Sequence, residues 1–192
     1  MLKRILFVCT GNTCRSPMAE ALLRALAQER GLQLDIRSAG VSTIDGLPVS
    51  KNAQTALSRR GIQHHSTSKA IETGSIAWSD LILTMTGSHK RQLLQKFPNA
   101  VDKTYTLLEF ANDDPEVLKR IAELEGLLSE WHMSQALGQP LSEEKRVKLL
   151  QLEQQMPSFD IDDPFGGPLE IYEMSAAQIE AALKRLLDRL QQ

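Results

Sequence analysis

The chain has 192 residues, of which 42% are apolar and 24% are charged, and its formal net charge is −2. This length suits one domain, or one domain with an elaboration, and the apolar fraction is enough for a sizeable core. No basic stripe indicates nucleic-acid binding, no apolar run is long enough to cross a membrane, and the N-terminus lacks the apolar stretch of a signal peptide. We therefore expect a cytoplasmic protein without nucleic-acid or membrane partners, and the sequence leaves its oligomeric state unknown.

Strands and helices alternate along most of the chain. Short buried strands are predicted at Arg4–Val8, Leu34–Ser38, Asp80–Met85 and Lys103–Leu107. Helices are predicted at Pro17–Arg30, at Ser50–Arg60, from the end of the third strand to about Lys96, and at Ser175–Leu190. Ser16 and Pro17 are residue types that suit a helix N-cap and a first helical position. The alternation predicts an α/β fold, with an open parallel sheet of about four strands and helices on both faces.

The segment 113–157 breaks this alternation. A first apolar stripe at helical spacing comprises Val117, Ile121, Leu124, Leu128 and Trp131. After a Gly-Gln-Pro turn, Ser142 is expected to cap a second helix with an apolar face, formed by Leu149, Leu152 and Met156. We interpret residues 113–157 as a helical hairpin inserted within a single domain, 1–192. Its stripe serves either internal packing or the binding of a partner.

The loop Cys9–Arg15 connects the first strand to the first helix, which is the layout of an anion site. It has neither the Lys-Ser/Thr pair of a Walker loop nor the glycine pattern of a dinucleotide site. Instead it begins with a cysteine and ends with an arginine. A thiol among amide dipoles and beside a guanidinium ionises readily and becomes a nucleophile, while Arg15 can bind two oxygens of a phosphoryl group. The alternatives are a buried, inert Cys9 and a solvated Arg15 at the helix start.

A phosphoryl transfer also needs a proton donor for the leaving group. None of the histidines lies in an evident site loop, whereas Asp163 lies in the stretch DIDDPFGGPLE. Pro164 favours an extended conformation at Asp163, the glycines Gly166 and Gly167 permit close approach of the backbone, and Phe165 can form one wall of a pocket. Asp163 is therefore the candidate acid, and the alternative is an ordinary Asx-turn residue.

Taken together, these motifs resemble the low-molecular-weight protein tyrosine phosphatase family. The family pattern C-x4-C-R-S, with Gly-Asn inside it, corresponds to Cys9–Ser16, and its late Asp-Pro-aromatic motif corresponds to Asp163–Phe165. The stretches Ser38-Ala39-Gly40 and DLILTMT are also similar to the family. The resemblance covers residues 1–110 and 160–190, and it implies a Rossmann-like sheet with the phosphate loop after the first strand.

The resemblance also implies a role for each motif residue. Cys9 attacks phosphorus to form a phosphocysteine, Arg15 holds the phosphate, and Asp163 protonates the leaving group and then activates water. The phosphate and substrate are bound by Thr10, Gly11, Asn12, Thr13, Cys14, Ser16 and Phe165. Ser38 is expected to support Asn12, and Ser16 to hydrogen-bond the thiolate. No metal or cofactor is implied, and the expected partners are phosphorylated proteins.

Cys14 has two possible functions. It lies close to Cys9 in the loop, so a reversible Cys9–Cys14 disulfide could protect the nucleophile. The alternative is simple burial of the Cys14 thiol. The sequence does not distinguish between them.

Two features indicate one branch of the family, the protein arginine phosphatases. Tyrosine phosphatases usually carry a bulky aliphatic residue at the position of Thr13, whereas the arginine phosphatases carry threonine there and have DPFGG in the acid loop. One side chain is a modest basis for specificity, so a tyrosine phosphatase is the alternative.

An arsenate reductase would need resolving cysteines after Cys14, and a non-catalytic phosphate-binding module would not need Asp163. A histidine often found after Gly-Ile-x-x-x is replaced by Ser66.

Overall fold

The computed structural model describes residues 2–191, and these divide into two compact units. The first unit comprises the chain up to Ala111 and from Phe159 onward, and the second is Asn112–Ser158. The first unit holds a four-stranded sheet in the order β2-β1-β3-β4, with all neighbouring strands parallel. The predicted parallel sheet of about four strands is therefore confirmed.

The elements of the first unit are β1 (Arg4–Cys9), α1 (Arg15–Glu29), β2 (Asp35–Gly40), α2 (Lys51–Ser58), α3 (Thr73–Trp78), β3 (Leu81–Thr84), α4 (Gly87–Lys96), the 3-10 helix η1 (Pro98–Lys103), β4 (Thr104–Thr106), α5 (Leu107–Phe110) and α8 (Leu169–Leu190). Helices α3 and α5 and the 3-10 helix were not predicted. Each is short, so it presents too few residues for a period to be recognised.

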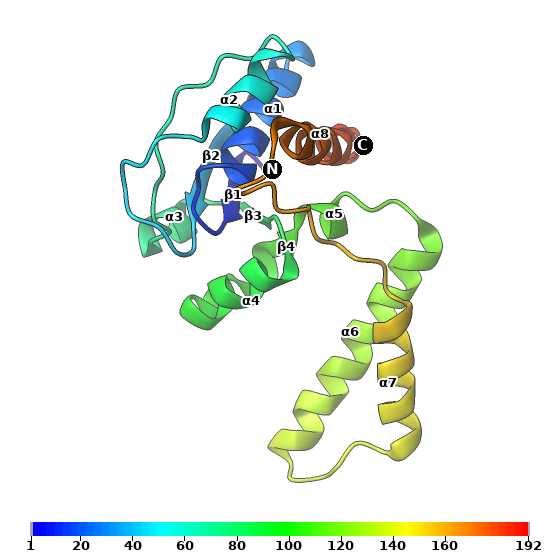
Figure 1. Cartoon of the computed structure of the whole chain (residues 1–192). Helices are drawn as coiled ribbons and strands as arrows, with labels where there is room; N and C mark the ends of the chain where they lie inside the picture. Colours follow the sequence, from blue (N-terminus) through cyan, green and yellow to red (C-terminus); the bar gives the residue numbers. More distant parts are fainter. Residues whose placement is uncertain (1, 192) are drawn as a thin grey trace. The chain divides into compact units, whose positions relative to one another are not determined.

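Strand β1 is buried on both faces, and its side chains alternate between two layers of core. Ile5 and Phe7 pack into the cluster formed with α1, α2 and α8, while Leu6 and Val8 pack with α3 and α4 on the other face. The same two layers are visible around the sheet of this unit in Figure 1. Because β1 is central, its carboxyl end at Cys9 lies in the interior of the sheet edge, between the ends of β2 and β3.

Two helix starts differ from the prediction. Helix α1 begins at Arg15, with Cys14 at the N-cap position and no side-chain cap, so Ser16 is not the N-cap. The Ser16 hydroxyl is engaged with Cys9 and Asn12, and the chain is already helical at Arg15. Helix α8 begins at Leu169 rather than at Ser175. Ser175 is a buried helical residue, and its hydroxyl donates to the carbonyl oxygens of Asp162 and Ile171.

The second unit contains α6 (Pro115–Ala136) and α7 (Glu143–Gln155). The predicted cap is confirmed, since the Ser142 side chain accepts from the amide of Lys145. Val117, Leu127 and Leu152 are buried, whereas Trp131 stays 40% exposed. The apolar stripe therefore contributes only part of its surface to packing within the unit. Neither α6, α7 nor any other described helix combines the length and apolar character needed to cross a bilayer.

Gly40, the last residue of β2, is fixed by close packing against the loop that follows β1. It is paired with Cys9 in the register of the two strands, and a Cβ placed there would lie 2.6 Å from the Thr10 carbonyl oxygen and 3.1 Å from the Asn12 nitrogen. Real Cβ atoms do not approach backbone so closely, so any side chain at this position forces the loop to move. The glycine is therefore required for the position of the loop.

We expect Gly40→Ala to lower kcat/KM of the phosphatase activity that the resemblance implies by on the order of a hundredfold, because the loop amides are displaced. The measurement is steady-state hydrolysis of an aryl phosphate, together with thermal unfolding. Gly126→Ala, in α6, is the matched control, since no atom lies within 4 Å of the added Cβ. An active Gly40→Ala enzyme would contradict the role assigned to this contact.

Candidate active site

In the loop between β1 and α1, three backbone carbonyl groups point outward, toward residues 41–50. The carbonyl oxygens of Cys9, Thr10 and Thr13 accept from the amides of Val41 (2.9 Å), Ser42 (3.1 Å) and Ser50 (2.8 Å). In a trans peptide the next N–H points opposite to the carbonyl. The amides of Thr10, Gly11 and Cys14 therefore point away from residues 41–50. A loop held in this way presents N–H donors to an anion.

Asn12 is the internal brace of the loop. Its backbone has φ of 53°, in the left-handed region, where asparagine is tolerated better than most residues. Its side-chain amide donates to the hydroxyl oxygens of Ser16 and Ser38, each at 2.9 Å, and its carbonyl oxygen accepts from the Lys69 amide at 2.8 Å. The expected pairing of Asn12 with Ser38 is confirmed.

Ser38, which accepts from Asn12, is itself hydrogen-bonded to a residue of α1. Ser38 donates to the Glu20 carboxylate at 2.6 Å, and this carboxylate belongs to the same helix as Arg15 and Ser16. Ser66 occupies the place of the missing family histidine, and its hydroxyl contacts His64 Nε2 at 2.8 Å. The amide of Lys69, rather than that histidine, reaches Asn12.

Cys9 ends β1 with its thiol inside the loop. The side chain is buried, and Sγ lies 2.9 Å from the Ser16 hydroxyl oxygen, which confirms the expected contact. A hydroxyl at this distance can donate to a thiolate and favour the charged sulfur. Cys9 and Cys14 are both free thiols. Cys14 Sγ contacts the Tyr172 hydroxyl at 3.5 Å, so a disulfide with Cys9 stays a prediction.

Arg15 is buried, yet one of its donors has no partner. Nη1 donates to the Ile161 carbonyl oxygen at 3.0 Å, and Nη2 lies 2.8 Å from a carboxylate oxygen of Asp163. Nε is buried and has no hydrogen-bond partner. A buried N–H without a partner is costly, and an anion in the loop would satisfy it. Nε and Nη2 lie on one edge of the guanidinium, which is the edge that grips two phosphate oxygens.

The acid loop lies directly over Arg15. Asp163 is 56% exposed at its side chain, and its other oxygen accepts from the Phe165 amide at 3.1 Å in an Asx turn. Asp163 is therefore an Asx-turn residue whose carboxylate also pairs with Arg15, and its role as the acid stays a prediction. Phe165 is 77% exposed. A cavity of about 230 Å³ is lined by Cys9, Thr10, Gly11, Thr13, Cys14, Arg15, Asp163 and Phe165.

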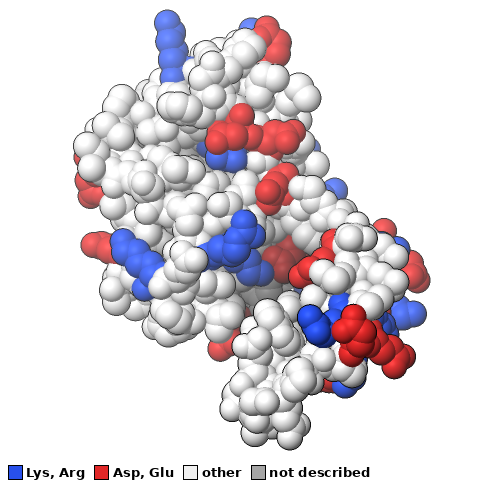
Figure 2. All heavy atoms as spheres, turned by 60° about the horizontal axis from the view of Figure 1, so that its bottom comes forward, with Lys and Arg blue, Asp and Glu red and all other residues white. Residues whose placement is uncertain are grey.

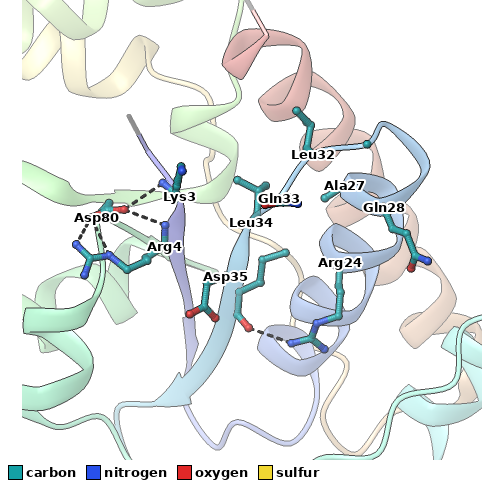
Figure 3. Close-up of a pocket in the computed structure, with 12 residues that line it drawn as sticks. Lys3, Arg4, Arg24, Ala27, Gln28, Leu32, Gln33, Leu34, Asp35 and Asp80 are labelled. Atoms are coloured by element: carbon teal, nitrogen blue, oxygen red, sulfur yellow. Dashed lines mark hydrogen bonds and ion pairs between the residues drawn. The ribbon is translucent and has the colours of Figure 1, made fainter.

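A larger cavity, of about 920 Å³, lies at the opposite edge of the sheet, beside the first residues of β1 and β2 (Figure 3). Arg4, Arg24, Asp35 and Asp80 in its lining are each already in an ion pair. Asp80 accepts from the Arg4 side chain and from the amides of Lys3 and Arg4, which hold the pKa of its carboxyl well below the usual range. Arg24 donates to the Ile36 carbonyl and to Glu20. Since its described lining includes neither a cysteine nor a buried side-chain donor without a partner, this cavity is not the candidate site.

Known protein families, sequences and structures that resemble this chain are phosphatases. The family described as "Low molecular weight phosphotyrosine protein phosphatase" matches residues 4–123. The chain belongs to this family. Two relatives described as protein-arginine-phosphatases are 33% identical (Geobacillus stearothermophilus, 98% of this chain and 96% of the relative) and 30% identical (Bacillus subtilis, 97% and 95%).

A solved structure also resembles the chain. It is described as the YwlE arginine phosphatase, in a mutant form with a phosphorylated active-site serine. It superposes with a TM-score of 0.73 at 29% identity, covering 98% of this chain and 96% of that one. The resemblance and the enzyme class predicted from the sequence are thus confirmed: the protein is a phosphatase.

The sequence did not single out His89 as a site residue. Its Nε2 lies 2.8 Å from the hydroxyl oxygen of Thr10, inside the loop region. A topological signal was available, because α4 begins just after β3, and the carboxyl ends of neighbouring parallel strands share one edge. The Ile161 carbonyl, which pins Arg15, carries no sequence signal at all.

We expect Asn12→Ala to lower kcat/KM by about tenfold to a hundredfold, because it removes the donor to Ser16 and Ser38 and the acceptor for Lys69. Asn12→Gly is the informative companion, since glycine adopts φ of 53° without strain. If Asn12→Gly were as active as the wild type, only backbone conformation would matter at this position, and the brace would be disproved.

Proposed function

We propose that this phosphatase hydrolyses phosphoarginine on proteins through a phosphocysteine intermediate. The observation that carries the chemistry is the buried Cys9 thiol, in a loop whose Arg15 Nε has no partner. What supports phosphoarginine is the pair of relatives described as protein-arginine-phosphatases, which match nearly the whole chain, together with Thr13 in the loop. A protein tyrosine phosphatase is the second candidate, favoured by the description of the family itself.

In the proposed first step, the Cys9 thiolate attacks phosphorus, the sulfur–phosphorus bond forms and the phosphorus–nitrogen bond to the substrate guanidinium group breaks. Asp163 gives its proton to the departing nitrogen. Arg15 Nε and Nη2 hold two equatorial oxygens, and the loop amides stabilise the charge that develops on them. Asp163 must then exchange its contact with Arg15 for one with the leaving group, and its exposed position permits that movement.

In the second step, water attacks the phosphocysteine. Asp163, now a carboxylate, takes a proton from the water, the sulfur–phosphorus bond breaks, and inorganic phosphate leaves. The Ser16 hydroxyl, 2.9 Å from Cys9 Sγ, stabilises the thiolate that departs. No metal or cofactor enters either step.

Phosphorylated protein is the substrate class that the phosphatase family implies. On the face drawn in Figure 2, side chains of both signs are interspersed, without a broad basic area. This distribution, like the net charge of −2, supports the prediction that nucleic acid is not a partner. A reducing compartment, as in the predicted cytoplasmic location, would keep the Cys9 thiol available for catalysis.

We expect Cys9→Ser to abolish turnover while retaining phosphate binding, because only the thiolate is lost.

We expect Asp163→Asn to lower kcat by on the order of 10²–10⁴ for substrates with poor leaving groups. The loss should be smaller for activated aryl phosphates, which need less protonation. Asp162→Asn is the matched control, because its carboxylate accepts from Gln178 and does not line the cavity. A larger loss in Asp162→Asn than in Asp163→Asn would show that the wrong aspartate was chosen.

Substrate choice is tested at Thr13, which is partly buried and lines the cavity. We expect Thr13→Ile to lower kcat/KM for phosphoarginine peptides and raise it for phosphotyrosine peptides, because a branched alkyl group favours a phenol ring over a guanidinium. A combined change of about tenfold corresponds to roughly 1.4 kcal/mol of differential transition-state binding. Thr13→Val separates loss of the hydroxyl from added bulk. A wild type that prefers phosphotyrosine peptides would overturn the arginine assignment.

A further inference from the structure

His89 contacts the phosphate loop from α4, on the side opposite to residues 41–50. Its side chain is 4% exposed, and its two ring nitrogens contact two threonine hydroxyls. Nε2 lies 2.8 Å from Thr10 Oγ1, and Nδ1 lies 3.0 Å from Thr86 Oγ1. The three side chains thus form a continuous hydrogen-bonded line, Thr86–His89–Thr10, from the start of α4 to the loop.

Burial and three charged side chains shift the pKa of this imidazole. Burial lowers the pKa of His89 to about 4, the neighbouring Arg15 guanidinium adds to that effect, and the Asp163 and Asp160 carboxylates oppose it. The ring is therefore neutral at neutral pH. A neutral imidazole carries one N–H, and its other nitrogen is an acceptor, so each hydroxyl contact has a defined direction.

The contacts of Thr86 and Thr10 are compatible with a ring proton on Nε2. Thr86 Oγ1 already accepts from the backbone amide of His89, at 3.2 Å. If Thr86 donates its hydroxyl proton to Nδ1, the ring proton must be on Nε2, and Nε2–H then donates to Thr10 Oγ1. In this arrangement the Thr86 hydroxyl and the Nε2–H group each have an acceptor. It also leaves the Thr10 hydroxyl proton free, on a residue that lines the cavity.

We propose that His89 is a positioning residue for the bound phosphate: it accepts from Thr86, donates to Thr10, and so directs the Thr10 hydroxyl proton into the cavity. The Thr10 carbonyl oxygen already accepts from the Ser42 amide. With the contact to His89, both the backbone and the side chain of Thr10 are hydrogen-bonded. The hydroxyl then becomes one more donor for a phosphate oxygen. This inference rests on the proposed function, because it assumes that the loop binds the phosphate of the substrate.

A donor to an unreacted phosphate oxygen contributes to ground-state and transition-state binding alike. We therefore expect His89→Ala and Thr10→Val each to raise KM, and the inhibition constant of inorganic phosphate, by about tenfold, with kcat changed only slightly. A tenfold change is roughly 1.4 kcal/mol. Because both variants break the same line, the double variant should lose no more than either single one.

Two conservative variants separate positioning from simple packing. His89→Gln retains a donor that can reach Thr10, and Thr10→Ser retains the hydroxyl, so both should restore most of the phosphate affinity. His132→Ala, at an exposed position of α6, is the matched control and should behave as the wild type. Thr10 is itself exposed, so Thr10→Val tests the proposal even if His89→Ala does not fold.

The spectroscopic test uses the wild-type enzyme labelled with ¹⁵N in its histidines. Nitrogen chemical shifts should identify His89 as the neutral Nε2–H form throughout the range from pH 5 to 8, and the Thr86→Val variant should perturb that signal. The proposal is overturned by an Nδ1–H form, by additive losses in the double variant, or by a lowered kcat with unchanged phosphate inhibition.

The kinetic assays use an aryl phosphate, which any phosphatase of this loop hydrolyses, so the outcome does not depend on phosphoarginine. Failure of the proposed function would appear differently, as turnover in Cys9→Ser or a preference for phosphotyrosine. Failure of the His89 inference alone would leave those results as expected.

Discussion

Outward rotation of the loop carbonyls is the constraint on which the site depends. Amides from residues 41–50 take up the carbonyl oxygens of Cys9, Thr10 and Thr13. With their carbonyls satisfied, the peptide units direct N–H groups to the opposite side, and this is what makes the loop a site for anions. The close approach of Gly40 and the left-handed backbone of Asn12 belong to the same arrangement, because they allow the loop to lie against β2.

The sequence predicted the features that depend on neighbouring residues. The apolar run of β1, the cysteine at its end and the arginine at the start of α1 are contiguous, so the anion loop could be identified from Cys9–Arg15. Asp163 was identifiable from its own motif, since Pro164 and the glycines define a turn. The helix cap was misassigned because Ser16 is a good capping residue by type, but the conformation of the loop brings its hydroxyl to the Cys9 thiol and the Asn12 side chain instead.

Features created by contacts across the fold were not predictable in this way. Whether a histidine such as His89 reaches the loop depends on the order of the strands and on the length of the β3–α4 connection. The Ile161 carbonyl that fixes Arg15 is backbone, so no residue type signals it. The same applies to the amides of Val41, Ser42 and Ser50, which are backbone groups as well. The sequence therefore predicts the reacting groups better than their supports.

The contact between Arg15 and the Ile161 carbonyl joins residues that are 146 positions apart. During synthesis, the loop is therefore translated well before the residues that its arginine contacts. The guanidinium then has neither the carbonyl that fixes it nor the carboxylate that it pairs with. The arrangement of Arg15 seen in the structure therefore forms only after residues 161–163 have been translated and have packed against the loop. A nascent chain that has not reached this point contains the loop sequence, but its Arg15 side chain has neither of these two partners.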